Sequence, residues 1–157
     1  MAWLQGSALG HAMRGSGVWA YGVVNLVHIL GIAALFGSIL VLDLRLLRFW
    51  RNIPLVAITR PTMPVAAAGF GVAVMSGVCM LATNATEYIG NPFLLIKFPA
   101  IGVGLVNVAV LNLLPGWKAR KARELSSNEQ VQLAVAGGLS LLCWLTAITA
   151  GRMIGYW

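Results

Sequence analysis

Three ionisable side chains lie within long apolar segments of the sequence, where a charge is expensive. His28 lies in the run YGVVNLVHILGIAALFGSIL, Lys97 in NPFLLIKFPAIG and Arg152 in AITAGRMIGYW. Placing such a group in the hydrocarbon region of a bilayer costs roughly 2.5 to 3.5 kcal/mol on insertion scales. We therefore expect each of the three to have a partner, a polar cavity or a function.

These residues are predicted to lie at a similar depth. With both chain ends outside, each lies roughly 7 to 14 Å below the outer surface at ~1.5 Å per helical residue. Met80, near the outer end of the second apolar segment, shares that layer. We therefore predict a site in the outer half of the bilayer, formed by His28, Lys97, Arg152 and Met80.

A b-type haem would use these residue types. An imidazole can bind the iron axially, and cations near the membrane surface can neutralise the two propionates. His28 would then be the axial ligand, with Lys97 and Arg152 as propionate or substrate contacts. A five-coordinate iron needs no second protein ligand, and otherwise Met80, Met153 or a deprotonated Lys97 could serve as one. His11 is the other histidine of the chain, and it would have to fold back over the outer face to reach the iron.

Two further chemical interpretations stay open. The residues Met75, Cys79, Met80 and His28 offer soft ligands suited to Cu(I), which would indicate copper handling. Without a metal, the outer-layer residues could bind a quinone or a carboxylate, relay protons or serve small-solute transport.

Structural roles are the plain alternative for the same residues. A neutral His28 could be satisfied by Asn25 or by a backbone carbonyl. Lys97 and Arg152 could extend their long side chains to the outer headgroups.

The composition indicates an integral membrane protein. Of 157 residues, 59% are hydrophobic and 10% are charged, against roughly 25% charged in soluble domains. Four apolar segments, about 19–46, 64–85, 92–114 and 130–155, approach the ~20 residues that span a bilayer. We predict one all-α transmembrane domain over residues 1–157, an antiparallel four-helix bundle. The N-terminal segment is expected to form a short interfacial helix.

Local sequence supports these boundaries. Pro54, Pro61 and Pro64 lie between the first two segments, and the second helix is predicted to begin at Pro64, where a missing N–H costs nothing. Ser126 and Glu129 form a capping-box pattern before the fourth segment.

The net charge of +7 is explained by basic residues that lie beside the predicted membrane segments. Basic residues cluster in the two loops after the first and third segments, so the positive-inside rule makes those loops cytoplasmic and both termini periplasmic in a bacterial inner membrane. A nucleic-acid partner is not expected. Asp43, at the inner end of the first segment, is predicted to pair with Arg48 or Arg60.

Small residues at four-residue spacing suggest a function of a different class. Such spacing lets helices approach closely in lipid, within the chain or between subunits. The pairs are Ala67 with Gly71, Ala73 with Gly77, and Ala147 with Gly151 and Gly155. The leading alternative is therefore a non-catalytic subunit or scaffold of a larger complex or homo-oligomer.

Three segments carry a resemblance to known proteins: VNLVHILGIAALFGSILVLDLRLLRFW, ATEYIGNPFLLIKFPAIGVGLVNVAVLN and LLCWLTAITAGRMIGYW. Together they resemble an uncharacterised bacterial family of four-helix inner-membrane proteins, to which no activity is attached. More distantly, His28 in the first segment and Lys97 in the third look like the haem-binding membrane protoporphyrinogen oxidases. That resemblance implies an axial histidine and a functional lysine. The first-segment histidine is also similar to that of CopD-type copper-resistance membrane proteins.

The function expected from the sequence is electron transfer or oxidoreduction by a membrane protein that binds haem b. A quinone or a redox protein would be its partner beside the lipid bilayer. No catalytic residue can be assigned, and whether the chain is an enzyme stays open.

Overall fold

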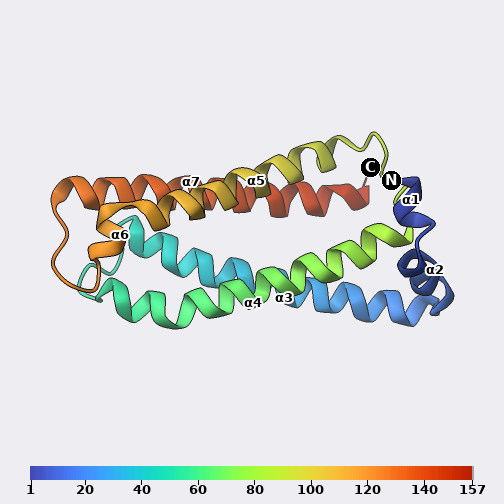
Figure 1. The fold of residues 1–157 in the computed structure, drawn as a ribbon, viewed down its shortest axis with the longest axis horizontal. Coiled ribbons are helices and arrows are strands. Elements are labelled where there is room, and N and C mark those ends of the chain that lie inside the picture. Colours follow the sequence, from blue (N-terminus) through green and yellow to red (C-terminus); the bar gives the residue numbers. More distant parts are fainter. Residues whose placement is uncertain (157) are drawn as a thin grey trace. The chain divides into compact units, whose positions relative to one another are not determined.

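The computed structural model describes residues 1–156, apart from the side chain of Val18. These residues form helices and connecting loops and contain no strand. The elements are α1 (Ala2–Gln5), α2 (Ala8–Gly15), α3 (Gly17–Leu46), α4 (Leu55–Thr83), α5 (Pro92–Leu113), α6 (Pro115–Ala119), α7 (Ser127–Met153) and the 3₁₀ turn η1 (Ile154–Tyr156) (Figure 1). Helices α3, α4, α5 and α7 are long and apolar enough to cross a membrane. The prediction of an all-α, four-helix membrane protein is confirmed.

The chain divides into two compact units. The first consists of Met1–Phe36 and Val65–Asn91, which include α1, α2, the first part of α3 and the last part of α4. The second consists of Gly37–Pro64 and the described chain from Pro92 onward.

In the first unit, α3 and α4 approach through glycines. A Cβ atom added to Gly31 would lie 2.9 Å from the backbone nitrogen of Ala73, and one added to Gly69 would lie 2.5 Å from that of Leu35. Both distances are shorter than real Cβ atoms tolerate, so only glycine permits this backbone contact. Close contact at small residues often holds helices together in lipid, where the hydrophobic effect contributes little to helix association.

The N-terminal helices attach to the end of α4. Helix α2 begins after Ser7, whose hydroxyl accepts from the Gly10 backbone N–H at 3.2 Å. The Arg14 guanidinium, in the last turn of α2, donates to the carbonyls of Thr83 at 3.0 Å and Gln5 at 2.8 Å. A cation here satisfies terminal carbonyls of α4 and complements its dipole. The N-terminal segment therefore forms two short helices, where the sequence predicted one.

Helix α4 begins at Leu55, earlier than the predicted start at Pro64, and Pro61 and Pro64 lie inside it. Each proline removes one backbone hydrogen bond. The hydroxyl of Thr62, which lies between the two prolines, donates to the Ile58 carbonyl at 2.7 Å. Membrane helices tolerate proline where neighbouring groups and local backbone adjustments satisfy the freed carbonyls.

In the second unit, α5 and α7 run side by side (Figure 1). Gly104 of α5 leaves only 3.5 Å between the position of an added Cβ and the Cβ of Cys143 on α7. The buried Asn107 amide donates to the Ala136 carbonyl at 2.9 Å, which is a hydrogen bond between α5 and α7. The buried apolar cluster of this unit contains Leu46, Leu55, Leu111, Trp117, Leu133 and Ala136.

The start of α7 confirms the predicted capping box. Ser126 accepts from the Glu129 backbone N–H at 3.3 Å, and the Glu129 carboxylate accepts from the Ser126 N–H at 2.8 Å. Arg123 adds two hydrogen bonds to that carboxylate, at 2.7 and 2.9 Å. Within residues 1–156 this is the one ion pair that the structure contains.

The predicted ion pair of Asp43 is wrong. Asp43 is 3% exposed on α3, and the Ser140 hydroxyl of α7 donates to its carboxylate. No arginine pairs with it in the described chain. The reason is position, because Arg48 lies beyond the end of α3 and both Arg48 and Arg60 are exposed.

Candidate functional site

His28 lies half-buried on α3, against α4 of the first unit. Its Nδ1 atom is 3.0 Å from the Ser76 hydroxyl oxygen. Ser76 is buried, and that oxygen is only 2.5 Å from the carbonyl of Val72. A hydroxyl has a single proton, and here it is donated to the Val72 carbonyl. Nδ1 of His28 is therefore the protonated nitrogen and donates to Ser76, which leaves the ring lone pair on Nε2.

A glycine makes room for the imidazole. A Cβ added to Gly77 would lie 3.1 Å from Cε1 of His28, which is tighter than most real contacts. The ring therefore rests on the α4 backbone and is held by Ser76 from the preceding position. Ser76 was not among the predicted site residues, and the expected partners of His28 were Asn25 or a backbone carbonyl. The available signal was a serine followed by glycine inside an apolar span.

Among the possible soft ligands, Met80 is best placed within the first unit. It is half-buried and follows Ser76 by one helical turn, so the two lie on the same face of α4. Met75 is 73% exposed and lies on another face, which weakens a copper site that needs both methionines. His11 is exposed on α2.

Lys97 and Arg152 belong to the second unit. Lys97 is half-buried on α5, with Nζ 3.2 Å from the position that a Cβ on Gly151 would take. The neighbouring Arg152 is exposed. Its guanidinium lies 4.6 Å from the centre of the Tyr156 ring and donates to the Tyr156 hydroxyl. The two cations predicted to share a layer therefore point differently, Lys97 onto α7 and Arg152 outward at its end.

A metal held by several protein ligands is not indicated. In the described residues, no three side chains from His, Cys, Asp and Glu gather closely enough to hold an ion.

These features define an integral membrane protein with four long apolar helices and one oriented histidine inside the first of them. The chain belongs to DUF6644, a family of unknown function whose model matches residues 1–157. No curated protein and no solved structure matches the chain. Membership of this family implies no particular activity.

Proposed function

We propose that this chain is a membrane b-type haem protein in electron transfer or oxidoreduction, with Nε2 of His28 as an axial ligand. The observation that supports the proposal is the hydrogen bond from Nδ1 to Ser76. Histidines that bind metals almost always donate their other ring N–H, which fixes the tautomer and makes the ligating nitrogen more basic. His28 has this arrangement inside an apolar helix.

The residues of the first unit fit such a group. His28 supplies the nitrogen ligand, Ser76 orients it, and Met80 offers a thioether on the Ser76 face of α4. Haem iron, when bound, would supply one-electron redox chemistry. The neighbours of His28 along α3 are aliphatic, among them Val27 and Ile29, and an apolar shell of this kind tunes the potential of a metal centre.

Lys97 and Arg152 are proposed as contacts for propionates or substrate. Lys97 is the stronger candidate, because its half-buried ammonium lies in an apolar span and pairs with no carboxylate in the described chain. Arg152 already bonds Tyr156 and is exposed at the end of α7. We further propose that both termini are periplasmic, that the membrane is the bacterial inner membrane, and that a quinone or a redox protein exchanges electrons with the centre.

The alternative of a scaffold subunit has less support. Two of its three small-residue faces are used within the chain. Ala73 is buried against α3 beside Gly31, and Ala147 is buried in the second unit, where Gly151 contacts Lys97. The pair Ala67 and Gly71 is exposed, as is Gly155, and these positions remain available to another subunit.

The test is an ultraviolet-visible spectrum of detergent-purified protein, oxidised and reduced, from cells well supplied with haem. We expect a Soret band that shifts on reduction, is lost in His28→Ala and is kept in His11→Ala, the matched control. In Ser76→Ala, haem affinity should fall roughly 10- to 100-fold, as expected for a partner that orients a metal ligand.

A flat visible spectrum in the wild type would refute the haem proposal. Metal analysis of the same sample would then identify copper, and a metal-free protein would favour the scaffold or proton-handling alternatives. Circular dichroism of each variant distinguishes loss of the cofactor from loss of the fold.

A further inference from the structure

A cavity of about 700 Å³ lies in the second unit, at the end of α3 and the start of α7. Its walls come from the end of α3, the loop 47–54, the loop 120–126 and the first turns of α7. Six basic side chains and a single acidic one, Glu124, line it. The basic residues are Arg45, Arg48, Arg51, Arg120, Lys121 and Arg123. We call this the basic cavity.

Its charge is largely uncompensated. The chain has 11 lysines and arginines, so more than half of them surround one cavity. In the described residues only Arg123 has an ion-pair partner, Glu129. Backbone carbonyls hold others, since Arg45 donates to Ile53 at 2.8 Å and Arg51 to Arg48 at 3.2 Å. Neutral carbonyls fix the guanidinium groups in place without cancelling their charge.

Arg120 is the most constrained of these side chains. Its guanidinium stacks 3.9 Å from the ring centre of Trp117, which is 2% exposed, and donates to the Trp117 carbonyl. Its Nε atom is buried and has no hydrogen-bond partner in the part of the chain that is described. A buried donor without a partner costs free energy and is rare in native proteins. An anion in the basic cavity could accept the hydrogen bond from this Nε atom.

The loop that carries Arg48 and Arg51 is held in an unusual backbone conformation. Arg48 has φ +75° and Trp50 has φ +49°, the left-handed region that non-glycine residues rarely adopt. Such strain costs of order 1 kcal/mol or more per residue and concentrates at ligand sites. Here it accompanies the placement of Arg48 and Arg51 on the cavity wall.

The lining indicates the chemistry of the ligand. Arginine forks bind phosphate through paired hydrogen bonds. Beside the cations the cavity has an apolar wall of Leu46, Leu55, Leu125 and Leu133, a combination suited to a group that is anionic at one end and aliphatic at the other. Basic pockets at the ends of membrane helices bind lipid headgroups in this way.

We propose that the basic cavity binds a phosphate-bearing anion, supplied either by an anionic phospholipid headgroup or by a soluble phosphate compound. This inference is independent of the proposed haem, because it uses no residue of the His28 site.

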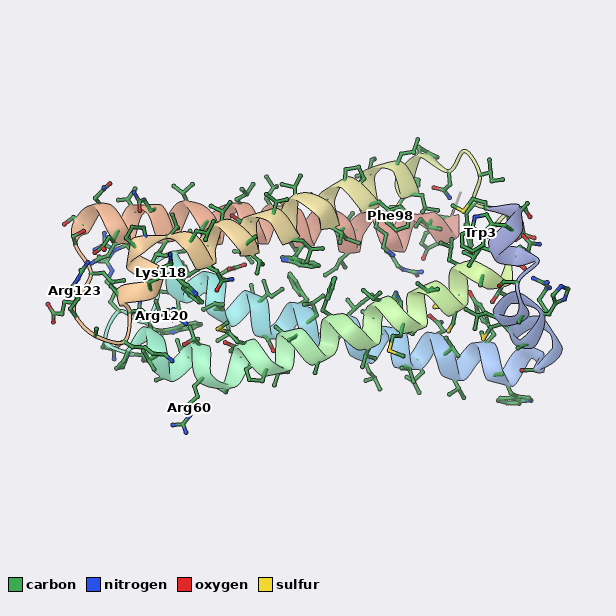
Figure 2. All side chains as sticks on the ribbon, viewed as in Figure 1. Trp3, Arg60, Phe98, Lys118, Arg120 and Arg123 are labelled. Atoms are coloured by element: carbon green, nitrogen blue, oxygen red, sulfur yellow. The ribbon has the colours of Figure 1, made fainter. Side chains whose placement is uncertain are left out.

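The full-length protein provides a matched pair of variants for the test. Arg51→Gln with Lys121→Gln removes two charges from the cavity. Arg60→Gln with Lys118→Gln removes two exposed charges from the same unit that do not line it. Figure 2 shows the Arg60 side chain pointing away from α4.

Native mass spectrometry of detergent-purified protein would measure retention of phosphatidylglycerol against phosphatidylcholine. Titration calorimetry would measure the binding of inorganic phosphate to the same protein. Each cation near an anionic group contributes roughly fivefold in affinity, so the cavity variant should bind its anion roughly 30-fold more weakly, while the control stays near wild type. Raising the salt concentration should also release the anion from the wild-type protein.

Selective, salt-sensitive retention of phosphatidylglycerol that the cavity variant loses would identify a lipid headgroup. Phosphate binding lost in the same variant, without lipid selectivity, would identify a soluble ligand. The proposal is overturned if the wild type binds neither, or if both double variants bind equally. Because the salt titration uses the wild type, it tests whether the anion is held electrostatically even if the cavity variant does not fold, and salt-insensitive binding would also overturn the proposal.

Discussion

The contact between α3 and α4 in the first unit predicts a graded response to alanine. A Cβ on Gly69 would lie 2.5 Å from the Leu35 nitrogen, roughly 0.9 Å short of the 3.4 Å at which ordinary contact begins. A Cβ on Gly31 would be roughly 0.5 Å short of that distance from Ala73. Gly71, in contrast, has open space where its Cβ would be.

The magnitudes follow from two opposing effects. Alanine favours a helix over glycine by about 1 kcal/mol, so Gly71→Ala should stabilise the protein by up to that amount. Overpacking typically costs 1 to 3 kcal/mol, and here both partners are backbone that cannot rotate away. Gly69→Ala should therefore lower the free energy of unfolding by about 2 kcal/mol net, with Gly31→Ala between the two.

Denaturant titration in a fixed detergent, followed by circular dichroism, would rank the three variants. Their far-ultraviolet spectra should be alike, because each change favours the helix itself. If Gly69→Ala is as stable as Gly71→Ala, the helices do not meet at these glycines and the described packing is incorrect.

Three further predictions concern single hydrogen bonds. Ser126→Ala should lower the free energy of unfolding by about 1 kcal/mol because α7 loses its N-cap, which would be measured as a lower midpoint of thermal unfolding. An unchanged midpoint would contradict the capping box. Arg14→Gln should release α2 from the end of α4 at Thr83, seen as faster amide hydrogen exchange in residues 2–15, and unchanged protection would argue against this attachment. Asn107→Val should lower the free energy of unfolding by about 0.6 kcal/mol, the average for hydrogen bonds between membrane helices, because the bond to Ala136 is lost. Equal stability of the variant and the wild type in denaturant would mean that this bond contributes nothing.

The class of the protein could be predicted because the membrane restricts the choices. A chain with four long apolar runs and few charges must satisfy its backbone internally, so helices are the available answer. The capping box at Ser126 is a local pattern and was predicted correctly. The start of α4 was not, since the tolerance of a helix for Pro61 depends on its surroundings as well as on the residue.

The arrangement around His28 could not be predicted for a geometric reason. Sequence gives the depth of a residue along a helix, whereas its partner depends on how two helices rotate against each other. Ser76 faces His28 because glycines set that rotation, and their contacts depend on the tertiary structure. The basic cavity was similarly hidden. Its charges were visible as a topology signal, but their convergence depends on the loop conformation at Arg48 and Trp50.

The attachment of the N-terminal helices to α4 has a consequence for biogenesis. Arg14 bonds a carbonyl 69 residues later in the chain, and Gln5 bonds Thr86, 81 residues later. Helices α1 and α2 are synthesised before α4, so they cannot dock until α4 has been inserted and its C-terminal end has crossed the bilayer. Until then, the residues at the end of α4 that α1 and α2 contact are not available to them. Docking of α1 and α2 therefore follows insertion of the helical hairpin that α3 and α4 form. A fused protein that blocks Gln5 would leave this hairpin inserted, with α1 and α2 detached from the end of α4.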